Sequence, residues 1–209
     1  MRVLIVKLSS LGDVVHTMPA VQDIRARIPQ ARIDWVVEKA FAPLVARCEG
    51  VDEIIPCELR RWSRAPLSHE TRSDWRTFRK QLRSVRYDAI VDLQGLTKSA
   101  LIARAARTSE LGRRYAMANR THGASYEAPT RWVADVAIEL EPHVHAVQRA
   151  REICARAFQY EMPPHLSFGL HAQVQPDVDR NAICFVHGTS RGDKCWPQMN
   201  WVLLGKRLL

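Results

Sequence analysis

Residues 1–18 have the sequence MRVLIVKLSSLGDVVHTM, and the interpretation of the whole chain starts from them. Arg2 to Lys7 are mostly β-branched and aliphatic, which is typical of a strand buried on both faces of a parallel sheet. A short polar turn follows, and Asp13 stands where a helix is expected to begin. In open α/β sheets, ligands bind at the carboxyl ends of the strands, so Asp13 is expected at the edge of a cleft.

The same strand-then-helix pattern continues along the chain. It predicts further strands at 31–38, 53–57, 87–93 and 110–113, and helices at 13–28, 41–48, 73–85, 97–106 and 144–158. This alternation predicts an α/β fold, a Rossmann-like parallel sheet with helices on both faces. The pattern weakens over residues 114–141, which are expected to form a long loop with one short helix.

A second strand–turn–helix pattern follows a proline-containing stretch at residues 162–179. It consists of a strand at 182–187, the turn GTSRGDKCW and a helix from 197 to 209. Because one βα unit cannot bury its own apolar faces, the second Rossmann-like domain is expected to be incomplete. We therefore predict an N-terminal domain at 1–160, a linker at 161–180 and the first βα unit of a C-terminal domain at 181–209.

Composition and charge narrow the functional classes. The chain has 209 residues, a net charge of +9 and five cysteines without a CxxC pair, which predicts reduced thiols in the cytoplasm. Between Arg60 and Arg86, nine basic residues stand against two acidic ones, which indicates an anionic partner or an ordinary solvated basic surface. No recognition helix or aromatic stacking motif favours nucleic acid.

Asp13 has two interpretations that the sequence leaves open. Aspartate is a preferred helix N-cap. A carboxylate at the mouth of the first strand can also act as a general base on a bound hydroxyl. Ser9, Ser10 and the amides around Gly12 could bind an anion at the positive end of the helix, although no G-x-G-x-x-G fingerprint or P-loop is present.

Basic and hydroxyl-bearing stretches supply the other candidates. Arg60 and Arg61 follow the third predicted strand in an expected loop. Their guanidinium groups could bind carboxylates or phosphates, and the alternative is an ordinary basic loop without a ligand. The stretch HGTSRGDK at 187–194 lies between a predicted strand and helix, where its amides, hydroxyls and Lys194 could hold a diphosphate. His143 and His145 are two residues apart and are not expected to bind a metal.

Several separated stretches together resemble one known family. They are MRVLIVKLSSLGDVVHTMPAV, IDWVVE, IIPCELRRW, YDAIVDLQGLTKSA and HGTSRGDKCWP, and they resemble the bacterial heptosyltransferases of glycosyltransferase family 9. The resemblance implies the GT-B architecture of two facing Rossmann-like domains. It also implies inverting transfer of L-glycero-D-manno-heptose from ADP-heptose to Kdo-lipid A in lipopolysaccharide inner-core biosynthesis, without a metal or other cofactor. The enzyme would act in the cytoplasm, peripherally on the inner membrane.

The resemblance also assigns roles to residues of this chain. Asp13 would be the base on the acceptor hydroxyl. The resemblance places the donor's diphosphate and sugar at Thr189, Ser190 and Lys194, with Ser190 where a threonine is more usual. Residues expected to meet the anionic acceptor are Ser9, Ser10, Arg60, Arg61 and Arg120.

One departure from the family pattern is large. The family's second domain continues with further βα units, including an acidic residue for the ribose and a D-[ST]-G…H stretch, and this sequence contains neither. The 209-residue chain alone is therefore expected to have little or no transferase activity. The alternatives are a related sugar-nucleotide transferase, or a non-catalytic protein that binds the lipid A core or the membrane surface.

Overall fold

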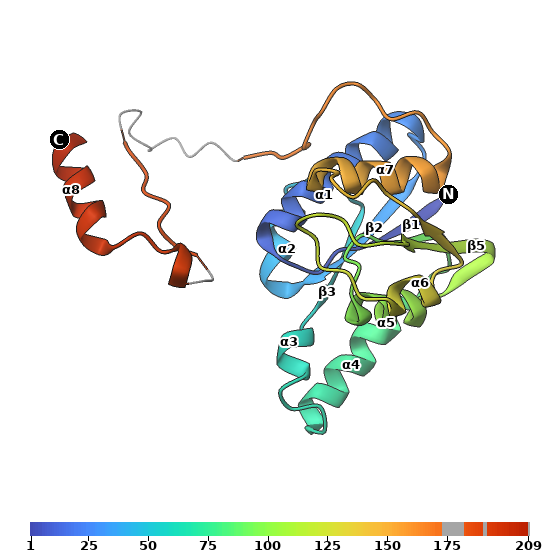
Figure 1. Cartoon of the computed structure of the whole chain (residues 1–209). Coiled ribbons are helices and arrows are strands. Elements are labelled where there is room, and N and C mark those ends of the chain that lie inside the picture. The colour runs from blue at the N-terminus through green and yellow to red at the C-terminus, as the bar shows by residue number, and fades with distance from the viewer. Residues whose placement is uncertain (173–181, 190–191, 209) are drawn as a thin grey trace. The chain divides into compact units, whose positions relative to one another are not determined.

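The computed structural model describes residues 1–172, 182–189 and 192–208 (Figure 1). The chain divides into two compact units, Met1–Ala172 and Gln173–Leu209. All strands of the described residues belong to the first unit. The predicted domain limits at residues 160 and 181 stay a prediction.

A six-stranded parallel sheet forms the centre of the first unit. Its strands are β1 (Arg2–Val6), β2 (Arg32–Glu38), β3 (Glu53–Cys57), β4 (Tyr87–Asp92), β5 (Thr108–Met117) and β6 (Val136–Ile138). They lie in the order β3-β2-β1-β4-β5-β6, so the direction of winding reverses between β1 and β4. In doubly wound sheets this reversal marks the place where ligands bind. The predicted α/β fold is confirmed.

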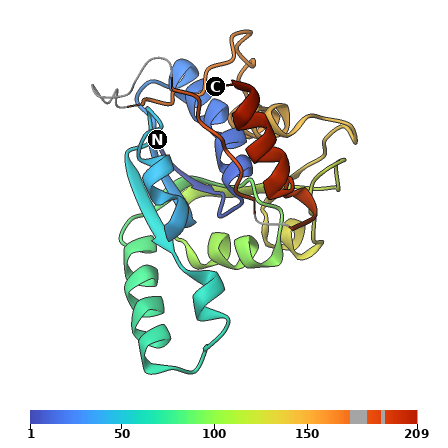
Figure 2. The same cartoon turned by 90° about the vertical axis from the view of Figure 1, so that its left-hand side faces the viewer.

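Helices cover both faces of this sheet (Figure 1). They are α1 (Leu11–Arg27), η1 (Lys39–Phe41), α2 (Ala42–Val45), α3 (Leu59–Trp62), α4 (His69–Leu82), α5 (Thr97–Ala105), α6 (Pro129–Val133) and α7 (Ala146–Phe158). Val3 and Ile5 of β1 pack in the core under α1 and α7, whereas Leu4 and Val6 pack in the core under α4 and α5. The apolar run of β1 is therefore buried on both faces, as the sequence predicts. The short α3 and the longer α4 lie beside each other beyond the sheet (Figure 2).

The strand predicted at 110–113 exists but is too short in the prediction, and the loop expected at 114–141 is wrong where it contains strand residues. β5 has ten residues rather than the four predicted at 110–113, and β6 lies inside the expected loop at 114–141. Polar side chains in β5 hide its strand pattern, and its pairing with β4 shifts register between Tyr87 and Ala89. The three-residue β6 is too short for a periodic signal. The short helix expected in this region is α6.

Helix boundaries and the second unit also differ from prediction. The first helix begins at Leu11, and Arg60 and Arg61 lie in α3 rather than in a loop. No strand forms at 182–187 among the described residues, because no neighbouring strand pairs with them. The predicted turn contains η2 (Gly192–Lys194), and α8 (Gln198–Leu208) forms the helix predicted at 197–209.

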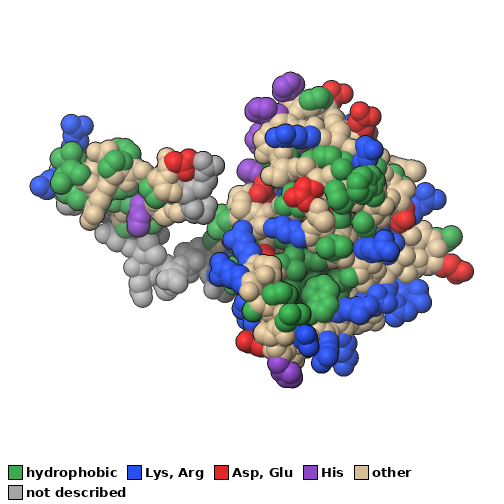
Figure 3. All heavy atoms as spheres, turned by 60° about the horizontal axis from the view of Figure 1, so that its bottom comes forward, with side chains coloured by type: hydrophobic (Ala, Val, Ile, Leu, Met, Phe, Trp, Pro, Cys, Tyr) green, Lys and Arg blue, Asp and Glu red, His purple; other side chains and the backbone are tan. Residues whose placement is uncertain are grey.

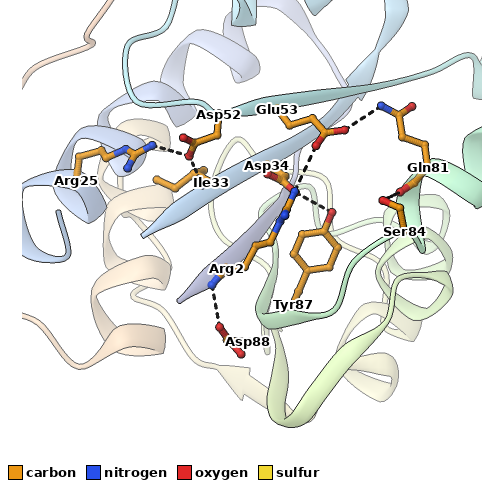
Figure 4. Close-up of polar contacts among 10 residues, drawn as sticks. All are labelled: Arg2, Arg25, Ile33, Asp34, Asp52, Glu53, Gln81, Ser84, Tyr87 and Asp88. Carbon is orange, nitrogen blue, oxygen red and sulfur yellow. Dashed lines mark hydrogen bonds and ion pairs between the residues drawn. The ribbon is translucent and has the colours of Figure 1, made fainter. Parts of the chain in front are cut away.

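A buried polar cluster joins the amino-terminal ends of the strands (Figure 4). Oδ2 of Asp34 accepts hydrogen bonds from Nε of Arg2 and from the hydroxyl of Tyr87, each at 2.9 Å. Arg2 also pairs with Glu53, which accepts a hydrogen bond from Gln81 of α4. Burial raises the pKa of Asp34, although the bonds from Arg2 and Tyr87 oppose this shift. These contacts fasten β1, β2, β3 and β4 together at the end opposite Asp13.

Replacing Tyr87 by Phe tests this cluster. The variant keeps the buried ring but removes one hydrogen bond from the Asp34 carboxylate, whose Oδ1 already has no hydrogen-bond partner among the described residues. We expect the free energy of unfolding to fall by about 1–3 kcal/mol, measured by urea denaturation. Tyr126→Phe, which removes the half-buried hydroxyl bond to the carbonyl of Ala118, is a matched control with a smaller expected loss. Equal stability of Tyr87→Phe and the unmodified chain would contradict the prediction.

Candidate active site

A cavity of about 100 Å³ lies at the carboxyl ends of the central strands, where the winding of the sheet reverses. Its walls come from the loops that follow β1, β4 and β5, and from helices α1 and α7. The residues lining it are Lys7, Asp13, His16, Thr17, Leu93, Gln94, Met117, Gly123, Ala124, Ser125, Ala146, Arg149, Ala150 and Ile153. The structure therefore places Asp13 in a cleft, as its position in the sequence predicts.

The start of α1 fixes the carboxylate of Asp13. Ser10, not Asp13, is the N-cap, and Asp13 is the third helical residue. Its Oδ2 accepts hydrogen bonds from the amide of Ser10 at 2.9 Å and from the hydroxyl of Ser10 at 2.8 Å. The bond from the amide of Ser10 is the contact that the third helical residue makes in a capping box. Oδ1 of Asp13 accepts no hydrogen bond from the described residues, so one oxygen is held and the other is open to a ligand.

Two cations share the cavity with this carboxylate. Lys7 is the first residue after β1, and its Nζ donates a hydrogen bond to the carbonyl of Leu93 at 2.9 Å. Arg149 reaches the cavity from α7 and donates to the hydroxyl of Thr121 at 2.9 Å. Burial lowers the pKa of both side chains, and the charge of Asp13 opposes that shift in each. One carboxylate beside two cations gives the cavity a net positive charge, which suits an anionic ligand.

The pKa of Asp13 is set by opposing effects. Burial alone raises it, but the amide of Ser10, the charge of Lys7 and the hydroxyl of Ser10 outweigh burial and bring it below its ordinary value. Asp13 is therefore ionised at neutral pH and able to accept a proton. A ligand that fills the cavity removes water from the carboxylate and raises its basicity.

Replacing Lys7 by Met tests this electrostatic coupling. Methionine fills similar space without the charge, so the pKa of Asp13 is expected to rise. Titration of the Asp13 side-chain carboxyl carbon by ¹³C NMR measures the shift directly. Lys39→Met is the matched control, because Lys39 is exposed and outside the cavity, and it should leave the Asp13 titration unchanged. An identical Asp13 titration curve in the Lys7→Met variant would show that Lys7 does not act on the carboxylate.

The loop after β4 fixes the position of the loop after β1, which carries Ser9 and Ser10. Oε1 of Gln94 accepts hydrogen bonds from the backbone amides of Leu8 and Ser9 at 3.0 and 3.1 Å. Asp92 shapes the turn beneath it by accepting the amides of Gln94 and Gly95. Burial raises the pKa of Asp92 to about 6 against these hydrogen bonds. Ser9 is buried with its amide already bonded, whereas Ser10 is exposed and contacts Asp13.

The three candidate arginines do not line the cavity around Asp13. Arg60 of α3 is exposed and lines a different pocket. Arg61 is paired with Asp74, Glu58 and Glu70, and hydrogen bonds to the first two raise its pKa. Arg120 is exposed in the loop after β5. The structure therefore separates these residues: Arg61 is held by acidic neighbours, while Arg60 and Arg120 remain available.

The donor-binding candidates fall in the second unit. Thr189 is exposed at the end of the stretch 182–189, and Lys194 is exposed in η2. Ser190 lies outside the described residues. Among the described residues no three His, Cys, Asp or Glu side chains are placed to hold a metal ion. His145 instead accepts the amide of Val147 at the start of α7.

Comparison with known proteins assigns the family. The sequence model of glycosyltransferase family 9 (heptosyltransferase) matches residues 75–209. The chain belongs to glycosyltransferase family 9. It is 37% identical over 217 residues to lipopolysaccharide heptosyltransferase 1 of Pseudomonas aeruginosa, covering 100% of this chain and 58% of the relative. It is 36% identical over 211 residues to the Escherichia coli K12 protein of the same name, covering 96% of this chain and 62% of the relative.

A solved structure agrees with this family assignment. Escherichia coli heptosyltransferase WaaC with ADP-2-deoxy-2-fluoro heptose superposes with a TM-score of 0.87 at 34% identity, covering 100% of this chain and 65% of that one. The SSLGD and RRW stretches predict likeness to the first heptosyltransferase rather than the second, and the relatives confirm it. Heptosyltransferase 2 of Salmonella typhimurium matches only 49% of this chain, at 33% identity. This family 9 chain thus spans about 60% of the length of its curated relatives.

Sequence reasoning missed the two cations of the site. Lys7 carries a usable signal, because it is the charged residue that ends an otherwise apolar run at the carboxyl end of β1. Arg149 carries no such signal in the sequence, since only the packing of α7 against α1 brings it beside Asp13.

A search of the described helices of this family 9 chain for a membrane-spanning segment finds none with the necessary length and hydropathy.

Proposed function

We propose that this chain supplies the catalytic base, Asp13, and the acceptor-binding residues of a heptosyltransferase. The reaction is inverting transfer of L-glycero-D-manno-heptose from ADP-heptose to Kdo-lipid A in lipopolysaccharide inner-core biosynthesis. Support comes from membership of glycosyltransferase family 9 and from relatives named lipopolysaccharide heptosyltransferase 1. The similar Escherichia coli structure that holds ADP-2-deoxy-2-fluoro heptose supports an ADP-activated donor.

The observation that carries this proposal is the carboxylate of Asp13 in its positively charged cavity. In the reaction, Oδ1 of Asp13 accepts the proton of the acceptor hydroxyl while that oxygen forms a bond to the anomeric carbon. The bond from the anomeric carbon to the diphosphate breaks, and ADP leaves with the electron pair. Attack from the side opposite the diphosphate inverts the anomeric centre. No covalent sugar–enzyme intermediate is needed.

The acceptor is proposed to meet Ser9, Ser10, Arg60, Arg61 and Arg120. Lys7 and Arg149 add positive charge where carboxylates or phosphates of the acceptor would approach Asp13. Arg60 and Arg120 are exposed and suited to bidentate contacts with such groups. Arg61 must first exchange at least one of its acidic partners for the ligand, so its contribution to acceptor affinity is expected to be smaller.

The donor is proposed to bind through Thr189, Ser190 and Lys194, with Lys194 as a point charge on the diphosphate. Lysine near the leaving group stabilises the negative charge that develops as the sugar–phosphate bond breaks. We place the enzyme in the cytoplasm, on the inner face of the inner membrane, where a basic surface favours anionic lipids.

A transfer assay with a stereochemical readout tests the function. Because the relatives are longer, the chain is assayed both alone and joined to the remaining portion of the Escherichia coli relative. Incubation with ADP-heptose and Kdo-lipid A is expected to release ADP and add one heptose, detected by mass spectrometry. NMR of the product should show the anomeric configuration opposite to that of the donor. Retained configuration, or no transfer by the joined protein, would overturn the proposal.

A further inference from the structure

The side chain of Gln94 joins the segments that follow β1 and β4 beyond the end of the sheet. Val6 and Asp92 are the last paired residues of these two strands. After them, the backbone amides of Leu8 and Ser9 donate hydrogen bonds to Oε1 of Gln94 at 3.0 and 3.1 Å. One side-chain oxygen therefore takes the place of the backbone acceptors that a longer β4 would supply.

The two amides depend on this one acceptor. Leu8 is 0% and Ser9 is 6% exposed, so water is largely excluded from both residues. Among the described residues, no other oxygen accepts a hydrogen bond from either amide. A buried backbone amide without an acceptor is unfavourable, so the loss of Oε1 would displace this segment until its amides reach water or another acceptor.

The turn after β4 fixes the position of Gln94 itself. Asp92 is 2% exposed, and its Oδ1 accepts hydrogen bonds from the backbone amides of Gln94 and Gly95 at 2.9 and 3.2 Å. Its Oδ2 accepts a hydrogen bond from the hydroxyl of Ser99 in α5 at 2.9 Å. The place of Oε1 is thus set by the buried end of β4 and by α5 before any ligand binds.

The contacts of Gln94 lead directly to the base. Ser9, which Gln94 holds, precedes Ser10, and the amide and hydroxyl of Ser10 hold Oδ2 of Asp13 at 2.9 and 2.8 Å. Gln94 and Asp13 also line the same cavity. A displacement of Ser9 would therefore move the two donors that orient the carboxylate.

We propose that Gln94 is a positioning residue for the transfer reaction, because its Oε1 holds Leu8 and Ser9 and thereby keeps the carboxylate of Asp13 in its reactive orientation. A misplacement of about 1 Å in a reacting group can lower a rate on the order of 100-fold. The effect on the reaction rate rests on the proposed function. The effect on the carboxylate of Asp13 does not, and the two are measured separately.

Replacing Gln94 by Met tests the effect on Asp13 in the 209-residue chain. Methionine fills similar space, but it provides no oxygen for the two amides. Because the amide and hydroxyl of Ser10 lower the pKa of Asp13, their displacement should raise that pKa, as measured by ¹³C NMR of the side-chain carboxyl. Gln22→Met is the matched control, since Gln22 also bonds to the backbone, at the carbonyl of Glu49, but lies outside the cavity. An unchanged Asp13 titration in Gln94→Met would overturn the proposal.

Kinetics of the joined protein test the consequence for the reaction. Gln94→Met should lower kcat at least about tenfold and change the KM for ADP-heptose little. Figure 3 shows lysine and arginine side chains on the end of the first unit that carries α3 and α4. In the described part of the chain, the side chain of Gln94 forms hydrogen bonds only with Leu8 and Ser9 and with none of these cations, so the KM for the acceptor should change less than kcat.

A conservative variant separates positioning from a general loss of stability. Gln94→Glu keeps an oxygen that can accept both amides and should restore most of the turnover that Gln94→Met loses. Turnover is compared on the plateau of the pH–rate profile, where the charge added beside Asp13 no longer changes its protonation. Gln94→Asn is one methylene shorter and cannot keep both hydrogen bonds at their present lengths, so it should also lower kcat.

The outcomes distinguish this inference from the proposed function. Circular dichroism confirms that each variant is folded. A kcat near that of the unmodified protein in Gln94→Met and Gln94→Asn would overturn the positioning role, as would equal losses of kcat in Gln94→Met and Gln94→Glu. No transfer by the unmodified joined protein would instead overturn the proposed function, and the Asp13 titration would still decide whether Gln94 positions the carboxylate.

Discussion

Replacing Asp13 by Asn is expected to lower the rate of heptose transfer by about 10²–10⁴-fold, the usual contribution of a general base. Asparagine has nearly the same shape, and its carbonyl oxygen can still accept the hydrogen bonds that Ser10 donates to Asp13. The start of α1 should therefore stay folded, and binding of ADP-heptose should change little. Turnover and donor affinity are measured separately, by the transfer assay on the joined protein and by calorimetry.

A second variant separates the two roles that the sequence leaves open for Asp13. Ser10→Ala removes the hydroxyl that donates to Asp13 but keeps the carboxylate. It should lower the free energy of unfolding by about 0.5–2 kcal/mol, the cost of losing a helix cap. Because Ser10 is also proposed to meet the acceptor, the KM for the acceptor should rise, while turnover at saturating acceptor should fall far less than in Asp13→Asn. If Asp13→Asn retained turnover near that of the unmodified protein, Asp13 would be a capping-box residue without a role as base.

Most of the sheet could be predicted from the sequence because its central strands are buried on both faces. β1, β2 and β4 are largely apolar runs between polar turns, and their observed bounds lie within one residue of those predicted. The same signal fails toward the β5–β6 edge of the sheet. Only residues 110–113 of the ten-residue β5 are predicted as a strand, because polar residues such as Arg113 and Arg114 interrupt its apolar pattern. β6 is held there by the hydrogen bonds that Asp135 forms with the backbone of Arg114, which no local pattern reveals.

The sequence could predict a residue of the candidate site only where the position of that residue after a strand places it at the carboxyl end of the sheet. Asp13 follows the first strand after one short polar turn, so the sequence places it at the carboxyl end of the sheet. Ser10, Lys7 and His16, which shift the pKa of Asp13, are its neighbours in the sequence, whereas Arg149 comes from a distant segment and reaches the cavity only through the packing of α7. Arg61 shows the opposite case: its residue type suggests ligand binding, but Glu58, Glu70 and Asp74 converge on it once α3 and α4 fold together.

The contact that fixes α7, and with it Arg149, is a buried ion pair to α1. Nε and Nη2 of Arg151 donate to the two carboxylate oxygens of Asp23 at 2.7 and 3.1 Å. The side chains of Arg151 and Asp23 are only 3% and 4% exposed. Arg151 also donates to the carbonyls of Pro163 and His165, so it ties the segment after α7 to the same point. Removing the arginine would leave a carboxylate buried without its counter-charge.

Replacing Arg151 by Met is therefore expected to lower the free energy of unfolding by about 3–5 kcal/mol, measured by urea denaturation. Arg104→Met is the matched control: Arg104 is an exposed arginine on α5, and its loss should change stability by less than about 0.5 kcal/mol. The double variant Asp23→Leu with Arg151→Met should recover part of the loss, because it leaves no unpaired buried charge. Recovery stays incomplete, since the carbonyls of Pro163 and His165 still lack their donor. An equal free energy of unfolding for Arg151→Met and Arg104→Met would show that the ion pair does not hold α7 in place. The position of Arg149 beside Asp13 would then depend on the apolar contacts between α1 and α7 alone.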